Sequence, residues 1–370
     1  MSYVLTEEQQ FLKDSAKDLF KKAPVALIRD LRDGDDEEGY STDLWQQMVE
    51  MGYPGIVVSE ASGGMDFGMR ALGVLMEESG RSLSASPLLT VSVAAAIIEK
   101  YGSDNQKQKV TEICEKGTVV ALALQEGNFY KPEQSDIVAK KEGDAYTLSG
   151  VKDMVADGHA AASFIVTANT DEGVTAFLIG KDVAGVSIDK EFMMDSRYYS
   201  KLKLENVSVP SSSVLGGAGK GKKVANDVTN MANALISNEL VGVMSEAFDR
   251  TVAYLKERRQ FEKEIGSFQG LQHRAADLYG EIEIAKSLAI KALDAIDEAD
   301  FMAPAICSMA KAKCVKVSQL ATNEGVQMFG GIGMTDDEEI GFFMKRARVA
   351  SQQYGGYAYH VDRFATMNGY

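Results

Sequence analysis

The hydrophobic period of this chain changes twice, and these changes restrict its fold more than any other feature of the sequence. Apolar residues recur at helical spacing as far as about residue 117, and then fall in short β-rich runs as far as about residue 220. Beyond that point the helical period returns and is sustained over long segments. We therefore expect an N-terminal helical domain over 1–117, a β-domain over 118–220 and a C-terminal helical bundle over 221–370.

The middle region predicts a small antiparallel sheet. Its β-rich runs are separated by Gly, Asp or Asn turns and comprise Tyr146–Gly150, Ser163–Ala168, Val174–Ile179 and Lys201–Glu205, the last extended to Pro210. The run Gly216-Gly217-Ala-Gly219 has the composition of a linker that leaves this domain.

The last region predicts a four-helix bundle. Apolar residues keep to one face from Val241 to Leu255 and again from Leu271 to Ile296. Pro304 is placed to open a third helix, and the glycines from Gly330 interrupt the chain before a fourth. Long helices with short connections pack as an antiparallel bundle, so the fold class is α+β and mostly α.

Charge and composition exclude several classes of function. The chain has 39 Lys and Arg against 54 Asp and Glu, and its net charge is −15. Because such a chain repels phosphates, we expect neither nucleic acid nor an anionic membrane as a partner. Three cysteines without a CxxC pair and three scattered histidines provide neither a disulfide framework nor a metal site. The N-terminal segment resembles no signal peptide and no apolar run approaches ~20 residues, so we expect a cytoplasmic protein.

Two segments are candidates for binding a ligand. The run Gln327-Met-Phe-Gly-Gly-Ile-Gly333 can offer backbone amides to phosphate oxygens, although the same pattern is typical of a helix end and turn. In the run Tyr254–Phe261, the planar guanidinium of an arginine suits a pyrophosphate, and the ring of Phe261 suits an adenine or a flavin. The alternative for this second run is a charged helix end with core aromatics.

In this order, these segments resemble the acyl-CoA dehydrogenase family over nearly the whole chain. The matching motifs are Trp45, Gly52-Tyr-Pro-Gly55, Ser59-Glu-Ala-Ser-Gly-Gly64, Glu77-Glu-Ser-Gly-Arg81, Ala121-Leu-Ala-Leu-Gln-Glu126, Leu148-Ser-Gly-Val-Lys152, Arg258-Arg-Gln-Phe261, Phe268-Gln269 and the run from Gly330. The resemblance implies a three-part fold, FAD bound without a covalent bond at a dimer interface, and an acyl-CoA substrate. It further implies removal of the α-proton by a carboxylate, hydride transfer to the flavin and an electron-accepting flavoprotein as partner.

The resemblance also implies which residues surround the FAD. Arg258, Gln260 and Phe261 of one subunit are expected to reach the FAD of its neighbour. Gln327, Gly330 and Gly331 are expected at the ADP portion of the same FAD, and Met154, Val155 and Ala156 at the isoalloxazine ring. The acyl chain would enter the helical bundle.

The position of the family's catalytic base is where this sequence departs most from its relatives. Counted from the glycines at Gly330, the usual glutamate position carries Tyr354, and the alternative position on the first long helix carries Ala232. Glu239 follows Ala232 by seven residues on nearly the same helix face, which places it roughly 10 Å away along the axis. A phenol is a poor base at neutral pH. The catalytic base therefore stays unknown, with Glu239 a weak candidate.

Other departures concern the flavin itself. The usual Gly-Ser-Asp signature is replaced by Gly127–Lys131, the usual threonine beside the flavin is Ala156, and Glu262 stands where a glycine normally follows the Arg-x-x-Phe motif. These changes bear on FAD affinity and on activity without a partner.

The same departures resemble the small subunits of two-gene acyl-CoA dehydrogenases of the pimeloyl-CoA and steroid side-chain types. Lys152–Gly158, Asn238–Gly242, Gly331–Asp336 and Ile340–Arg346 carry this resemblance. It implies a larger partner that supplies the base, an α2β2 assembly and a role in lipid or steroid catabolism. The alternatives are a self-sufficient homo-oligomer with an unrecognised base, and a structural subunit without flavin. The sequence leaves the acyl group open.

Overall fold

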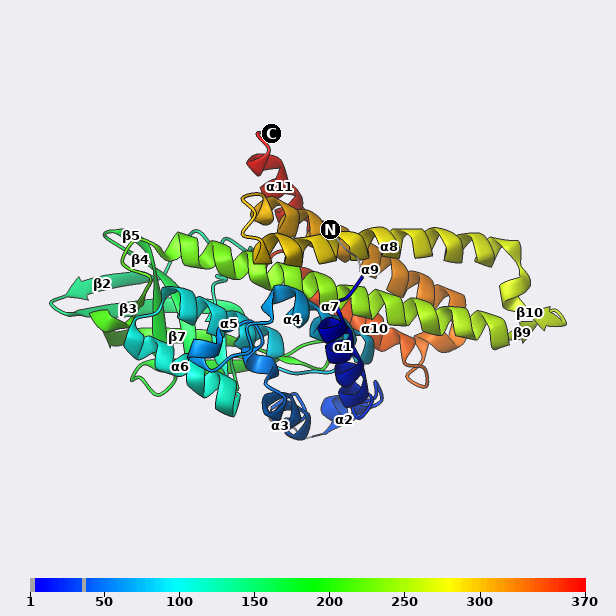
Figure 1. Cartoon of the computed structure of the whole chain (residues 1–370), viewed down its shortest axis with the longest axis horizontal. Coiled ribbons are helices and arrows are strands. Elements are labelled where there is room, and N and C mark those ends of the chain that lie inside the picture. Colours follow the sequence, from blue (N-terminus) through cyan, green and yellow to red (C-terminus); the bar gives the residue numbers. More distant parts are fainter. Residues whose placement is uncertain (1–3, 35–37) are drawn as a thin grey trace. The chain divides into compact units, whose positions relative to one another are not determined.

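The computed structural model describes residues 4–34 and 38–370, so the first three residues of the N-terminal segment discussed above lie outside it. The chain forms two compact units. A helical unit comprises 1–35, 69–84 and 233–370, and a second unit built on a sheet comprises 36–68 and 85–232. The order of helical, β and helical segments along the chain is the predicted one (Figure 1).

The second unit is organised around one sheet. Its strands are β1 (Val120–Ala123), β2 (Val138–Glu142), β3 (Ala145–Ala156), β4 (Ser163–Thr170), β5 (Gly173–Gly180), β6 (Val186–Phe192), β7 (Tyr198–Pro210) and β8 (Val214–Leu215). They lie in the order β6-β7-β3-β2-β4-β5-β8, and β1 also pairs with β4. The predicted β-rich runs all fall in strands, and the glycines from Gly216 follow the sheet as expected.

The prediction of a purely antiparallel sheet is wrong in one respect. β1 runs parallel to β4 over its whole length, and β2 meets β4 in parallel at one position. All four residues of β1 are buried, and so are the first six of β4. Strands buried on both faces read as continuous apolar runs, the pattern typical of parallel pairing, so alternation could not reveal β1.

The described part of this unit also contains α3 (Thr42–Glu50), α5 (Leu88–Tyr101), α6 (Asp104–Lys116) and the start of α7 (Gly221–Glu257), as far as Ala232. Trp45 of α3 donates its indole N–H to the carbonyl oxygen of Gly117 at 3.2 Å. Gly117 ends α6 with a φ of +64°, and a Cβ there would lie 2.4 Å from Val49. Glycine is therefore required both for the turn and for the close approach of α3.

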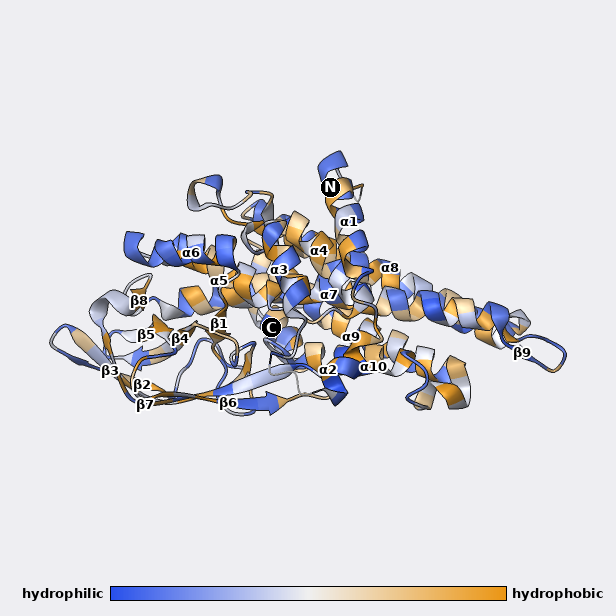
Figure 2. Cartoon of the chain, turned by 90° about the horizontal axis from the view of Figure 1, so that it is seen from below, coloured by the Kyte–Doolittle hydropathy of each residue, from blue (hydrophilic) through white to orange (hydrophobic). Residues whose placement is uncertain are grey.

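The helical unit contains α1 (Glu7–Phe20), α2 (Leu27–Asp33), α4 (Gly68–Ser82), α8 (Gln269–Asp297), α9 (Ala303–Phe329), α10 (Ile340–Gln352) and α11 (Tyr357–Met367). It also contains most of α7 (Gly221–Glu257), the first long helix. The four expected helices are present, and α11 is an additional one. Figure 2 shows hydrophilic residues along much of α8 near β9, where most residues of that helix are exposed.

Helices α4 and α7 approach each other closely at two glycines. A Cβ on Gly80 would lie 2.1 Å from the carbonyl oxygen of Glu239, and one on Gly242 would lie 2.0 Å from that of Glu77. Neither distance is compatible with a side chain, so the crossing of these helices depends on both glycines.

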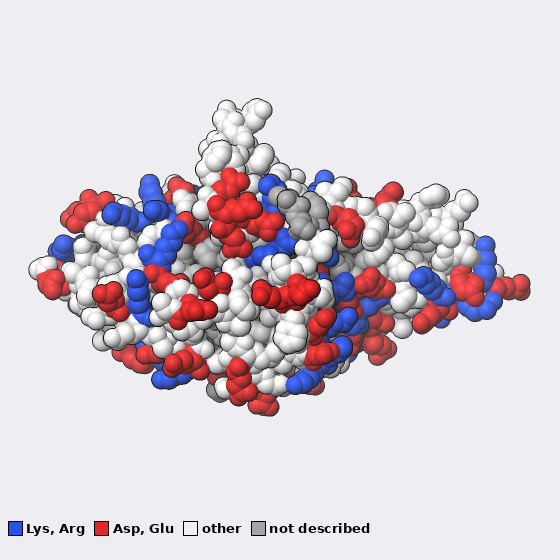
Figure 3. All heavy atoms as spheres, viewed as in Figure 1, with Lys and Arg blue, Asp and Glu red and all other residues white. Residues whose placement is uncertain are grey.

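Charged side chains of both signs are interspersed on the face shown in Figure 3. Within the helical unit, oppositely charged side chains pair, and Arg81, for example, lies 2.9 Å from Glu246 and 3.0 Å from Asp249. In the part of the chain that the structure describes, no helix combines the length and the apolar character that crossing a bilayer requires.

Candidate functional site

The turn between α10 and α11 carries Tyr354, the residue at the usual position of the base. Tyr354 has a φ of +52° and is followed by Gly355 at +99°, so the chain passes through two left-handed residues. Its side chain is only 7% exposed. Its carbonyl oxygen accepts hydrogen bonds from Asn233 Nδ2 (2.9 Å) and His360 Nε2 (3.1 Å). A bulky residue in this conformation is strained and needs such fixing by its surroundings.

The alternative base position, Ala232, is completely buried on α7. Glu239, two turns later, is buried as well, and its two oxygens accept hydrogen bonds from Arg346 Nε and Nη2, both at 2.7 Å. Freeing this carboxylate for proton abstraction would break a buried ion pair, which costs about 3–5 kcal/mol. The geometry therefore assigns Glu239 to the connection between α7 and α10.

The predicted Arg258–Phe261 segment forms a small exposed hairpin after α7. Its strands are β9 (Arg259–Gln260) and β10 (Lys263–Glu264), and the turn between them places Phe261 at φ +53° and Glu262 at +67°. The left-handed conformation explains why a glycine suits the position of Glu262. Phe261 is 84% exposed, and within the described residues no carboxylate pairs with Arg258. The hairpin thus presents the Arg258 guanidinium and an exposed aromatic ring, which meets Phe268 edge to face with centroids 6.1 Å apart.

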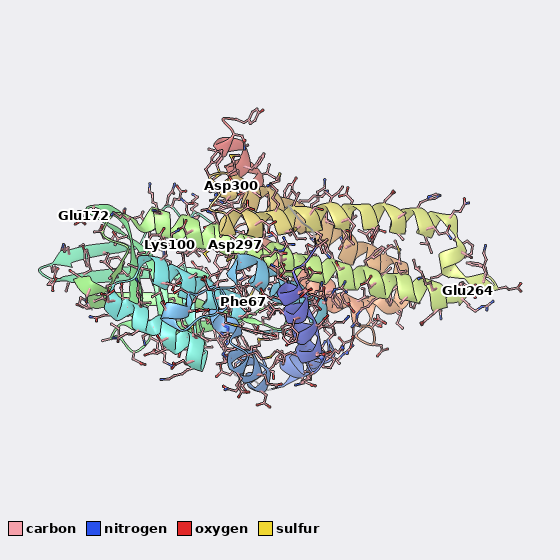
Figure 4. All side chains as sticks on the ribbon, in the orientation of Figure 1. Phe67, Lys100, Glu172, Glu264, Asp297 and Asp300 are labelled. Carbon is pink, nitrogen blue, oxygen red and sulfur yellow. The ribbon has the colours of Figure 1, made fainter. Side chains whose placement is uncertain are left out.

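The predicted glycine turn lies beside this hairpin. The ring of Tyr254 near the end of α7 stacks on Phe329 at the end of α9, with centroids 4.3 Å apart. Gly330 follows with a φ of +70°, and a Cβ on Gly330 or Gly331 would meet nothing within 4 Å. Figure 4 labels Glu264 at this end of α8 and Asp297 at its other end. Open backbone, an exposed ring and an unpaired guanidinium are therefore gathered at one end of the helical unit.

The third predicted segment, residues 154–156, lies at the end of strand β3 in the unit built on the sheet. The pairing of β3 with β7 is irregular between Lys152 and Val155, and Met154 inside this bulge has a φ of +52°. The side chains of Val155 and Ala156 are buried. They therefore offer backbone rather than side-chain groups to a ligand, and Ala156 has no hydroxyl to donate.

A buried ion pair fixes the strand that leads to this bulge. Lys152 is fully buried, pairs with Glu126 and donates to Thr167 Oγ1 at 3.0 Å. Burial lowers the pKa of the Lys152 ammonium, and the carboxylate of Glu126 offsets this only in part. The next residue, Asp153, accepts the N–H of Gly127 at 2.7 Å, so the segment that replaces the Gly-Ser-Asp signature is tied to β3.

These residues fit the ADP portion of FAD better than its ring. A pyrophosphate needs cations and free amides, which Arg258 and the open backbone at Gly330 and Gly331 offer. Phe261 offers an aromatic face. At the end of β3, Val155 and Ala156 offer only backbone groups. The roles of Gln260 and Gln327, both exposed, stay predictions.

The sequence analysis missed the polar residues that surround the Tyr354 turn from inside the bundle. Asn233 of α7, Lys311 of α9 and His360 of α11 are buried and bond to backbone oxygens of this turn or of the end of α10. Lys311 lies on the same face of α9 as Cys307 and Cys314, both buried. The sequence offers one signal for this cluster, which is Lys311 at a position where the helical pattern expects an apolar residue.

Known proteins agree with this architecture. Residues 6–116 match the family described as "Acyl-CoA dehydrogenase, N-terminal domain", and residues 219–365 match "Acyl-CoA dehydrogenase, C-terminal domain". A short-chain specific acyl-CoA dehydrogenase of Clostridium acetobutylicum is 28% identical over 362 residues, covering 94% of each chain.

Two solved structures are similar over almost their full length. Butyryl-CoA dehydrogenase from Megasphaera elsdenii has a TM-score of 0.91 at 26% identity and matches all of both chains. A variant of the Tcur3481-Tcur3483 steroid ACAD has a TM-score of 0.90 at 27% identity and matches 98% of each. The members of the family matched here are FAD-dependent oxidoreductases. With both family domains matched in order, the chain belongs to the acyl-CoA dehydrogenase family.

Proposed function

We propose that this chain is the small subunit of a two-component acyl-CoA dehydrogenase in which a larger partner supplies the catalytic base. The observation that carries the proposal is the missing carboxylate at both base positions, Tyr354 and Ala232. Glu239, the nearest alternative on α7, has both oxygens bonded to Arg346. The similarity to a steroid ACAD that is named after two components supports the same assembly.

FAD, when bound, supplies the acceptor for the hydride that leaves the β-carbon of the acyl thioester. The residues of this chain then have the tasks of binding and orientation. Arg258 would neutralise a pyrophosphate, Phe261 would lie against a ring of the nucleotide, and the backbone at Gly330 and Gly331 would approach phosphate oxygens. We expect these groups to serve the FAD of the neighbouring subunit, and an electron-transferring flavoprotein to receive the electrons.

Anaerobic bleaching of the flavin by a panel of acyl-CoA thioesters tests the missing base. The isolated chain loaded with FAD should not bleach at a useful rate, because general base catalysis typically contributes about 10²–10⁴-fold. The chain co-purified with its partner should bleach with at least one thioester. Rapid bleaching of the isolated chain would refute the proposal and return attention to Glu239.

Carboxylate restoration tests the same idea from the other side. Tyr354→Glu and Ala232→Glu should each give the isolated chain some bleaching activity, whereas Tyr354→Phe should give none. The gain is expected to be small, because a displacement of about 1 Å can cost ~10²-fold. Activity with Tyr354→Phe equal to that with Tyr354→Glu would show that the carboxylate is irrelevant.

Flavin content tests the role of the hairpin. Arg258→Ala should lower FAD occupancy in the assembled protein, since a charge-assisted hydrogen bond is worth about 1.5–3 kcal/mol. Arg259→Ala is the matched control, because the neighbouring Arg259 already pairs with Glu264 at 3.2 Å and should matter little. Gly331→Val should act like Arg258→Ala by filling the open space at the backbone. Equal occupancy in all four proteins would exclude this binding site.

A further inference from the structure

The carbonyl oxygens at the end of α10 and in the following turn are held by side chains from other helices. The carbonyl of Ala350 and that of Gln353 both accept hydrogen bonds from Lys311 Nζ of α9, at 3.1 and 2.8 Å. The carbonyl of Tyr354 is held from α7 and from α11, as described above. The last carbonyls of a helix have no partners within the helix, so these donors satisfy groups that would otherwise be buried and unpaired.

Lys311 is suited to this role because it is buried and meets two acceptors. Its side chain has no exposed surface, and its described hydrogen bonds go to these two carbonyls. Burial lowers the pKa of Lys311 to about 7; the charge of Arg346 lowers it as well, while Glu239 and Cys314 act in the opposite direction. The amino group has at least two N–H groups in either protonation state, so it can donate to both carbonyls.

His360 adds a series of hydrogen bonds to this network, and the donor and the acceptor of each can be assigned. A carbonyl can only accept, so His360 Nε2 carries the proton that it donates to Tyr354. Burial lowers the pKa of the His360 imidazole to about 3, so the ring is neutral and Nδ1 accepts from Ser308 Oγ at 3.3 Å. Ser308 Oγ in turn accepts from Arg363 at 3.0 Å. This chain fixes the tautomer and the orientation of the imidazole.

The turn that receives these bonds is the one that departs from ordinary backbone geometry. Two successive residues are left-handed, and the conformation is strained for the bulky Tyr354, so it persists only when the surroundings determine it. Donors from α7, α9 and α11 hold the turn in this conformation.

We propose that Lys311, Asn233 and His360 form a clamp that holds the Tyr354 turn in one conformation before any flavin or substrate binds. Lys311 is thus a positioning residue, since it acts on the turn through backbone oxygens. That the turn borders the reaction site rests on the proposed function, but the clamp itself does not. The clamp keeps position 354 ready for a neighbouring catalytic group even though this chain has no base there.

Hydrogen–deuterium exchange of the full chain without flavin or acyl-CoA tests the clamp. Lys311→Met keeps the volume of the side chain but removes both donors. It should speed exchange of the amides in 353–358 by at least about tenfold, the factor that corresponds to one lost hydrogen bond. Lys313→Met is the matched control, because Lys313 bonds to Glu281 at 2.6 Å and points away from the turn. Unchanged exchange at 353–358, or equal acceleration across α7, α8 and the turn, would overturn the proposal.

Two further variants keep the test decisive if Lys311→Met does not fold. Asn233→Ala removes the Nδ2 donor to Tyr354 and favours the helix, and it should raise exchange at the same amides. Lys311→Ala leaves a cavity with the shape of n-propylamine, and addition of that amine should restore slow exchange, whereas n-propanol should restore less. Failure of both variants to change the turn would refute the clamp. Because no cofactor is present, this result is independent of the bleaching assay, whose failure would refute only the proposed function.

Discussion

At the scale of single residues, one ion pair lies buried among the apolar side chains of the helical unit. Glu239 and Arg346 are almost fully enclosed, with side-chain exposures of 1% and 5%. Such a pair gains little over apolar residues of similar volume, but a partner left alone is strongly destabilising. The pair is therefore best understood as a specific link between α7 and α10.

This interpretation predicts a non-additive pair of substitutions. Glu239→Ala should lower the free energy of unfolding by about 3–5 kcal/mol, because it removes the carboxylate that pairs with the buried Arg346 guanidinium. The double variant Glu239→Met with Arg346→Met should regain most of this loss. Urea denaturation followed by circular dichroism measures both. Additive losses in the double variant would contradict the link.

The neutral imidazole of His360 predicts a dependence of stability on pH. Burial and the nearby Lys311 and Arg363 charges lower its pKa from 6.5 to about 3, while the bond to Tyr354 opposes the shift. Since the folded pKa is depressed, this stability is fully present above pH 6.5 and is lost as pH falls toward 3. Between pH 7 and 4 the loss should be about 3 kcal/mol. His360→Gln should remove this part of the acid sensitivity, and equal slopes of unfolding free energy against pH in both proteins would exclude it.

At the scale of elements, the crossing of α4 over α7 is set by backbone contact. Gly80 and Gly242 bring the two helices together without an intervening side chain. Gly242→Ala places a methyl group 2.0 Å from the carbonyl oxygen of Glu77 and should lower the free energy of unfolding by about 1–3 kcal/mol.

A control for this prediction lies in the middle of α8. A Cβ on Gly280 meets nothing within 4 Å, so Gly280→Ala should stabilise the chain by up to about 1 kcal/mol through helix propensity. Thermal unfolding of the two variants, compared with the unmodified chain, should therefore give shifts of opposite sign. A stabilised Gly242→Ala protein would show that the helices can separate freely.

An element can be predicted from the sequence when the residues that determine it lie close together in the chain. The helix near Pro304 and the strand at Lys201 follow from the hydrophobic period and from local proline and glycine signals, and they are present. The parallel pairing of β1 and the donors at the Tyr354 turn depend on residues far apart in sequence. No local pattern identifies which carbonyl a buried lysine reaches. Family resemblance placed Tyr354 at the position of the base, but only the coordinates show how its turn is held.

At the scale of the whole molecule, the exposed hairpin is the feature that bears on the proposed assembly. Phe261 combines high exposure with a strained turn, and α8 has many exposed residues in its first turns. Backbone strain at an exposed aromatic residue is maintained more easily when a partner or ligand fixes it. We therefore expect the hairpin to become ordered by assembly.

This expectation predicts a change in amide exchange on assembly. Residues 258–264 should exchange quickly in the isolated chain and at least about tenfold more slowly in the complex with its partner and FAD. The turn at Gly143, which joins β2 to β3 in the other unit, is a suitable reference and should stay fast. Equal exchange of the hairpin in both samples would place the partner elsewhere.

The clamp at the Tyr354 turn has a practical consequence for spectroscopy. Because the turn is held through main-chain oxygens, the residue at position 354 can be substituted while its backbone stays in place. A fluorinated tyrosine introduced there would sit at a defined point between α10 and α11. Its fluorine resonance would then report the arrival of each binding partner from inside the intact protein, with no need for turnover.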